Sequence, residues 1–272
     1  MKVYIHTDLE GVAGWVFYGN FASASLDNHA HVQRMNRLFT AEVAAAARAA
    51  LDAGADEVWV NDSHGSAYNL LFEELPAPCQ ILHGRPGYFD AWLAGFDATV
   101  DALVCLGQHA MAGTPGAICP HTCWHVNGDA FRLSEASMAA ALAGSHGVPC
   151  VCITGDDKIC AEVCAKVPGC EAAVVKWGLS AQNARTLTPA AACELIYAAV
   201  SRGVARRDQI APLVFPGPYR LNVSDRDPDL LVMPHDVEGA DFWETVHRAL
   251  NSYGYGHFGE DPLDDRSFRW PA

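Results

Sequence analysis

The sequence predicts an α/β protein, with a mostly parallel sheet covered by helices on both faces and a smaller C-terminal α+β unit. Strand-like and helix-like segments alternate through the first two-thirds of the 272 residues. The strand-like segments are continuous apolar runs, which indicates strands that are buried on both faces. Half of the residues are hydrophobic, so the chain can bury a large core.

The expected strands are short runs of β-branched and apolar residues. The first run ends in polar residues at Asp8, and the second, EVWVN, ends at Asn61. Such runs, bounded by turn-forming residues, are typical of strands. In chain order, the strands are predicted at residues 2–8, 57–61, 80–83, 102–106, 150–154 and 172–176.

The expected helices lie between these strands. Thr40 precedes an Ala-rich segment that Gly54 follows, and Ser134 precedes another. Ser and Thr are favoured as N-caps, and Gly is favoured just beyond a helix end. The helices are predicted at residues 40–53, 134–143, 158–166 and 189–202.

A domain boundary is expected after residue 205, where the segment ARRDQIAPLVFPGP concentrates charge and proline. Residues 1–205 then form the main α/β domain, and residues 206–272 form a small C-terminal α+β region. In this region, strands are predicted at residues 219–223 and 230–233, and a helix at residues 241–251.

The charge balance limits the classes of partner. Eighteen basic against thirty-two acidic residues give a net charge of −14. Nucleic acids and anionic membranes bind clustered Lys and Arg, so we expect neither as a partner. The start MKVYIHTD lacks the apolar segment of a signal peptide, and no run approaches the roughly 18 apolar residues of a membrane span. With ten cysteines in a long chain, we expect a cytoplasmic protein with reduced thiols.

Four residues of metal-binding types follow three of the expected strands. Asp8 and Glu10 follow the first strand, His64 follows the second, and His109 follows the run ALVCL. In open α/β sheets, ligands bind beyond the carboxyl ends of the strands, so we expect these side chains at one edge. Carboxylates and imidazoles packed together need a cation, and this mixed set suits zinc, with manganese or cobalt as substitutes.

Each of these residues also has an ordinary structural interpretation. A strand-end Asp often caps a helix, and a single His64 or His109 is more often a hydrogen-bonded polar residue than a ligand. Glu135, near the start of an expected helix, is typical of an acidic residue that complements the helix dipole. Only the joint occurrence favours a metal site.

Two further segments leave alternatives open. The run from Cys119 to His125 fits a structural zinc cluster, or a nucleophilic Cys119 or Cys123. Gly155-Asp156-Asp157 either forms a helix-capping turn or contacts the metal ligands or a substrate amine.

Six motifs occur together in an order that resembles the D-aminopeptidase family of zinc hydrolases. They are TDLEGVAG (7–14), VNDSHG (60–65), GQHAMAGTPG (107–116), HT (121–122), SE (134–135) and ITGDD (153–157). With residues 174–192, the resemblance covers the chain to about residue 200.

The resemblance implies a two-zinc site in which Asp8 bridges the metals. The remaining ligands would be Glu10, His64, His109 and Glu135, and His121 would match the catalytic histidine of the family. The resemblance also implies a large ring of identical subunits whose active sites face an internal chamber.

We therefore expect a two-metal hydrolase of amide bonds, an aminopeptidase acting on short peptides or amino-acid amides. D-stereospecificity is implied by the resemblance alone. The alternatives are a metallo-amidase or lactamase acting on a small non-peptide amide, and a metal-binding α/β protein without turnover. A pure binder needs no acid–base group, so His121 favours an enzyme.

Overall fold

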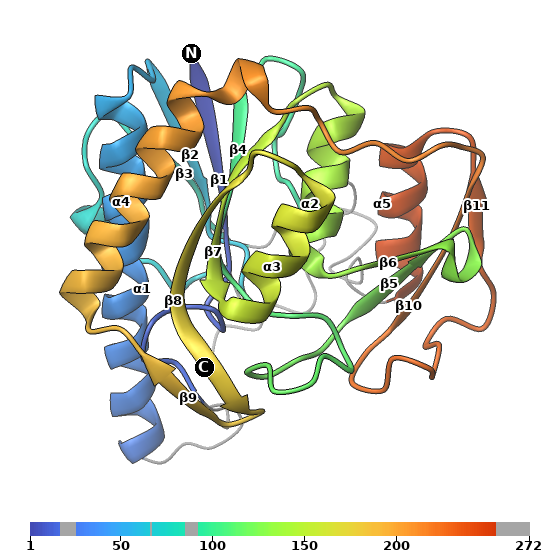
Figure 1. Ribbon diagram of the computed structural model, residues 1–272, viewed down its shortest axis with the longest axis horizontal. Helices are drawn as coiled ribbons and strands as arrows, with labels where there is room; N and C mark the ends of the chain where they lie inside the picture. Colours follow the sequence, from blue (N-terminus) through green and yellow to red (C-terminus); the bar gives the residue numbers. More distant parts are fainter. Residues whose placement is uncertain (17–25, 66, 85–91, 254–272) are drawn as a thin grey trace, which may run out of the picture.

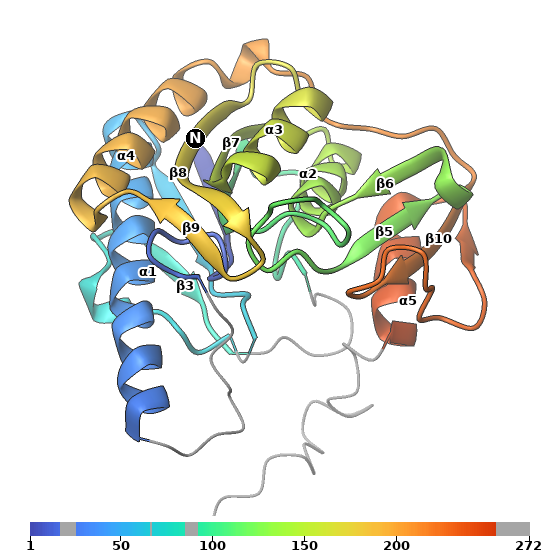
Figure 2. The ribbon, with the colours of Figure 1, turned by 60° about the horizontal axis from the view of Figure 1, so that its bottom comes forward.

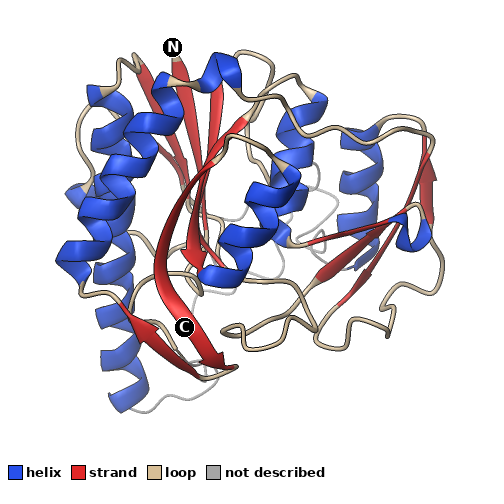
Figure 3. Ribbon diagram, in the orientation of Figure 1, coloured by secondary structure: helices blue, strands red, loops and turns tan. Residues whose placement is uncertain are grey.

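The computed structural model describes residues 1–16, 26–65, 67–84 and 92–253. Within these residues the main sheet has seven strands in the order β3-β2-β1-β4-β7-β8-β9 (Figures 1 and 3). Neighbouring strands from β3 to β8 pair in parallel, and β9 is antiparallel to β8. The strands are β1 (Lys2–Thr7), β2 (Glu57–Asn61), β3 (Gln80–Leu82), β4 (Ala102–Gln108), β7 (Cys150–Asp156), β8 (Glu171–Ser180) and β9 (Asn183–Thr186).

Helices cover both faces of this sheet. α1 (Leu26–Asp52) and α4 (Pro189–Ala205) pack against each other on one face. α2 (Glu135–Ser145) and α3 (Asp157–Lys166) pack on the other face, against β4, β7 and β8 (Figure 1). The predicted fold class is therefore confirmed. The alternation of strands and helices along the chain explains this fold class, because each parallel pair of strands needs a crossover connection, usually a helix.

A smaller antiparallel sheet lies beside the main one, with the strand order β11-β10-β5-β6. Its strands are β5 (Cys123–Val126), β6 (Phe131–Leu133), β10 (Tyr219–Ser224) and β11 (Val237–Gly239). α5 (Phe242–Tyr253) packs against β10 and β11. This sheet takes two strands from each side of residue 205. Three short 3-10 turns complete the described elements: Phe72–Glu74, Gly128–Ala130 and Arg207–Gln209.

The prediction that Thr40 caps a helix is wrong. α1 begins at Leu26, so Thr40 lies inside the helix. Its hydroxyl donates to the carbonyl of Asn36 at 2.7 Å and accepts from the amide of Leu71 at 3.0 Å. A buried hydroxyl is tolerated here because the helix and the Leu71 loop both satisfy it.

The predicted strand at residues 230–233 is also wrong. The segment forms one isolated bridge, between Ser224 and Leu231, and lies in turns and bends. Leu230, Leu231 and Val232 are exposed, and of this run only Met233 is buried in the core. No described helix combines the length and apolarity needed to cross a bilayer.

Candidate metal centre

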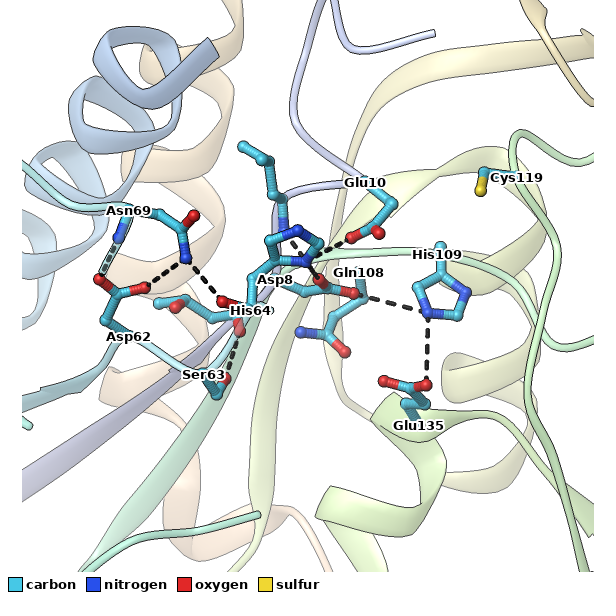
Figure 4. Close-up of polar contacts among 12 residues, drawn as sticks. Asp8, Glu10, Asp62, Ser63, His64, Asn69, Gln108, His109, Cys119 and Glu135 are labelled. Atoms are coloured by element: carbon cyan, nitrogen blue, oxygen red, sulfur yellow. Dashed lines mark hydrogen bonds and ion pairs between the residues drawn. The ribbon is translucent and has the colours of Figure 1, made fainter. Parts of the chain in front are cut away.

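The candidate ligands converge beyond the carboxyl ends of β1, β2 and β4. In Figure 1 these strands run downward from the N-terminus, and Figure 2 brings their ends forward. Asp8 and Glu10 follow β1, His64 follows β2, and His109 follows β4. Glu135 enters from the first turn of α2. The prediction that strand ends would gather these side chains at one edge agrees with their arrangement in Figure 4.

Two glycines let β1 and β4 approach closely at this edge. The amide of Gly11 donates to the carbonyl of Gly107 at 2.6 Å. A Cβ on Gly11 would lie 2.2 Å from the carbonyl oxygen of Gln108, and a Cβ on Gly107 would lie 2.1 Å from that of Asp8. Gly107 also has a φ of +70°, which side chains disfavour. Both positions therefore need glycine.

The first group of side chains comprises Asp8, Glu10 and His64. His64 Nδ1 lies 2.9 Å from Asp8 Oδ1 and 2.8 Å from Glu10 Oε2 (Figure 4). Two carboxylates therefore share one imidazole nitrogen, at spacings that a cation between them would also satisfy.

The second group comprises His109, His121 and Glu135. His109 Nε2 lies 3.7 Å from Glu135 Oε1 and 3.6 Å from Asp8 Oδ2. The ring of His121 stacks on that of His109, with centroids 3.7 Å apart. Asp8 thus joins the two groups, because one of its oxygens faces His64 and the other faces His109.

The charges of the site favour a bound cation. Burial alone would lower the pKa of His109, but the carboxylates of Glu135 and Asp8 raise it to about 10. The pKa of His64 is likewise raised well above its ordinary value, by Glu10 and Asp8 against the effect of burial. Burial together with the charge of Asp8 raises the pKa of Glu10. Positive charge is therefore favoured between these carboxylates.

Two buried atoms of the site support the same conclusion. Asp8 Oδ2 and His109 Nε2 have no hydrogen-bond partner among the described residues. Buried polar atoms are costly unless they are satisfied. Imidazole and carboxylate donors in this number suit zinc, so the side chains present fit the metal.

The loop after β2 orients His64, through residues that the sequence did not single out. The side chain of Asn69 donates to the carbonyl of His64 at 2.6 Å. Asp62 accepts from the amides of Asn69 at 2.7 Å and Leu70 at 3.0 Å. A signal that could have pointed to this role is the position of Asp62 two residues before His64.

The start of α2 is fixed in the same way. Ser134 caps the helix, as predicted, by accepting from the amide of Ser137. Glu162, on α3, accepts from the amide of Ser134 at 3.1 Å and from the Ser137 hydroxyl at 2.7 Å. These bonds set the position of Glu135. No sequence signal linked Glu162 to this turn, because the pairing arises only when α2 and α3 pack together.

His121 lies in a loop that is held from three sides. Cys119 and Thr122, on either side, have left-handed φ values of 45° and 53°, a conformation that costs free energy and is concentrated at functional sites. The amide of Cys119 donates to the carbonyl of Ala181 at 3.0 Å, and that of Thr122 to Asp225 at 2.8 Å. The third contact is a hydrogen bond from the amide of Ile118 to the carboxylate of Asp156.

Asp156 has two structural roles. Its Oδ1 accepts from the amides of Lys158 and Ile159 at 2.9 Å, which caps α3. Its Oδ2 accepts from the amide of Ile118 at 3.2 Å. The capping interpretation of this turn is confirmed, and the same carboxylate also fixes the loop of His121.

The alternative zinc cluster at residues 119–125 is not assembled. Among the described residues, the groups arranged to hold a metal are the two above, and neither includes a cysteine. His125 instead bonds to Asp129 at 2.7 Å and to Ser224 at 3.0 Å. Cys123 is buried, and its thiol contacts the sulfur of Met111.

Comparison with known proteins gives three results. The sequence model of the D-aminopeptidase family matches residues 1–248. A D-aminopeptidase of Bacillus subtilis (strain 168) is 29% identical over 219 residues, which cover 79% of this chain and 78% of that protein. A solved structure, the Zn-dependent D-aminopeptidase DppA from Bacillus subtilis, described as a self-compartmentalizing protease, has the same fold. It superposes with a TM-score of 0.83 at 24% identity, over 96% of this chain and 100% of that one.

Proposed function

The chain belongs to the D-aminopeptidase family, and on this premise we propose that it is a two-zinc aminopeptidase acting on short peptides or amino-acid amides. The observation that supports this most strongly is the position of Asp8. Its two oxygens face two separate groups of potential ligands, around His64 and around His109. A carboxylate so placed suits a bridge between two ions.

In this proposal, Asp8, Glu10 and His64 hold one ion, and Asp8, His109 and Glu135 hold the other. Two divalent ions bound there would polarise the scissile carbonyl and lower the pKa of a water molecule. His109 is prepared for this role, because its Nδ1 donates to the carbonyl of Ala110 at 2.9 Å and leaves Nε2 for the metal. Manganese or cobalt would substitute for zinc, since the same donors accept them.

His121 would act as the acid–base or oxyanion-binding group. Its Nδ1 lies 2.8 Å from the carbonyl of Cys119, which can only accept, so Nδ1 carries the proton. In this proposal Nε2 takes up a proton from the attacking water. The protonated ring then donates to the developing oxyanion or passes that proton to the leaving amine. Its stacking on His109 places this group beside the second ion.

The wider setting of the protein is proposed from its relatives and composition. Since a relative is described as a self-compartmentalizing protease, we propose a large ring-shaped homo-oligomer here as well. The ten cysteines occur as free thiols, which suits the reducing cytoplasm. The substrate would carry a free amine, which the net charge of −14 attracts.

The test of the proposed function is a panel of D- and L-aminoacyl amides, dipeptides and non-peptide amides, assayed with zinc-reconstituted protein. We expect hydrolysis of substrates with a free N-terminal amine, with the D-series cleaved faster. Cleavage confined to the non-peptide amides would favour an amidase instead. A protein that binds zinc and cleaves nothing in the panel would be a metal-binding protein without turnover.

A further inference from the structure

Lys176 is a fully buried lysine that the proposed chemistry does not use. It lies on β8, with 0% of its surface exposed. Its ammonium donates to three main-chain carbonyls: that of Glu10, that of Val12 at 3.2 Å and that of Trp15 at 2.8 Å. All three belong to the segment 10–15, which we call the Glu10 loop. One side chain from β8 therefore satisfies three of the six backbone carbonyls of this loop.

A second buried charge binds the same loop. Glu42, on α1, is 2% exposed, and its Oε1 accepts from the amide of Ala13 at 2.8 Å. Burial raises the pKa of Glu42 to about 7, although the Ala13 amide and Lys176 oppose the shift. Burial lowers the pKa of Lys176 to about 8, against the attraction of Asp156 and Glu42. Both groups bond to the backbone of the same loop, Lys176 to its carbonyls and Glu42 to the amide of Ala13.

Burying two charges costs free energy that apolar residues of similar volume would not cost. Both side chains bond to the same short loop, so we expect their burial to serve the position of that loop. The Glu10 loop also rests on the end of β4, where Gly11 contacts Gly107 and Gln108. His109 follows directly after this point. The position of the loop therefore sets where Glu10 lies relative to the ligands from β2 and β4.

We propose that Lys176 is a positioning residue, which together with Glu42 as the acceptor for the Ala13 amide fixes the Glu10 loop so that Glu10 can bind the first metal ion. This inference rests on the proposed two-zinc function. The carbonyl of Glu10 is bonded to Lys176, so loss of the ammonium frees the backbone of this ligand. The second group, around His109 and Glu135, has its own supports in Ala110 and Ser134 and does not depend on Lys176.

The decisive variant is Lys176→Met, which keeps the length of the side chain and removes its charge and donors. Cobalt or zinc is titrated into metal-free protein by calorimetry, and bound ions are counted after dialysis. We expect the affinity of one ion to fall by about 10- to 100-fold, the usual effect of losing a group that orients a ligand. The other ion should stay bound with its parental affinity, and the absorption of the cobalt form should lose one of two components.

The matched control is Val175→Ala, at the neighbouring buried position of β8, whose side chain points to the opposite face of the sheet. It should lower the melting temperature and keep both ions. If Lys176→Met weakened both ions equally, or if Val175→Ala caused the same selective loss, Lys176 would have only a general structural role and the inference would be overturned.

A second pair of variants decides the matter if Lys176→Met does not fold. Glu42→Gln keeps an acceptor for Ala13 and should keep both ions, whereas Glu42→Leu removes the acceptor and should weaken the same single ion. Equal affinities in the Gln and Leu variants would contradict the inference. A parent protein that binds fewer than two ions would instead contradict the two-zinc function, so the two failures are distinguishable.

Discussion

At the scale of single residues, the placement of the candidate ligands was largely predictable, and the residues that support them were not. Asp8, Glu10, His64 and His109 directly follow strands, so the expected sheet already placed them at one edge. Glu162 and Lys176 are far from those motifs in the sequence, and they meet the site only after α3 and β8 have packed. Periodicity and spacing carry no information about such contacts.

The proposed bridging role of Asp8 predicts the most damaging ligand substitution. Asp8→Ala removes the carboxylate that lies between both groups, so it should lose both ions and all measurable hydrolysis. Glu10→Ala should lose mainly one ion, because Glu10 contacts only the first group. Elemental analysis of the two dialysed variants checks this. Full metal content in Asp8→Ala would mean that another group forms the bridge.

The proposed role of His121 predicts a loss of turnover without a loss of metal. His121→Ala should lower kcat by about a hundredfold to ten-thousandfold, with a smaller effect on KM. Steady-state kinetics and metal counting on the same preparation provide the measurement.

The control for this variant is His125→Ala, since His125 is occupied by Asp129 and Ser224 and should be nearly neutral for kcat. If His121→Ala depleted metal and excess zinc restored activity, His121 would be a ligand. If His121→Ala retained the parental kcat, His121 would have no part in the reaction.

At the scale of elements, the long apolar strands were predicted well, and of the shortest strands β3 was predicted but β5, β6, β9 and β11 were not. β5 and β6 have only four and three residues, too few for a periodic signal. The run at residues 230–233 has the composition of a strand, yet it lacks a neighbouring strand to pair with along its length. Whether an apolar run becomes a strand depends on its partner, which the local sequence does not specify.

The close contact of β1 and β4 predicts that Gly107→Ala is severely destabilising. The new methyl group would meet the carbonyl of Asp8 at 2.1 Å, so the strand ends must separate, at a cost of about 2 kcal/mol or more. Gly54→Ala is the matched control, because Gly54 also has a positive φ but a methyl group there would meet no atom within 4 Å. Denaturant unfolding of both variants measures the two losses of stability. Equal losses would show that the close approach of β1 and β4 is not what makes Gly107→Ala destabilising.

At the scale of the whole molecule, the predicted layers were found, but the second sheet combines distant parts of the chain. β5 and β6 precede residue 205, and β10 and β11 follow it. Local composition had suggested a boundary there, and composition cannot show which strands will later pair. The long-range pairing of β5 with β10 is a property of the complete fold.

The proposed assembly predicts that the protein runs as a large homo-oligomer. Leu230, Leu231 and Val232 are three consecutive exposed apolar residues, and a subunit contact would cover such a group. Size-exclusion chromatography with light scattering gives the mass. A fully active monomer at all concentrations would refute the assembly.

The most direct test of the two-zinc account is to count metal ions and follow activity in one preparation. The purified protein should hold two divalent ions per chain. Five candidate ligands, with Asp8 between the two groups, exceed what a single tetrahedral zinc uses. Removal of the metal by a chelator should abolish hydrolysis of aminoacyl amides, and stepwise return of zinc should restore it only as the second ion binds. A metal-free preparation with undiminished hydrolysis would contradict the account.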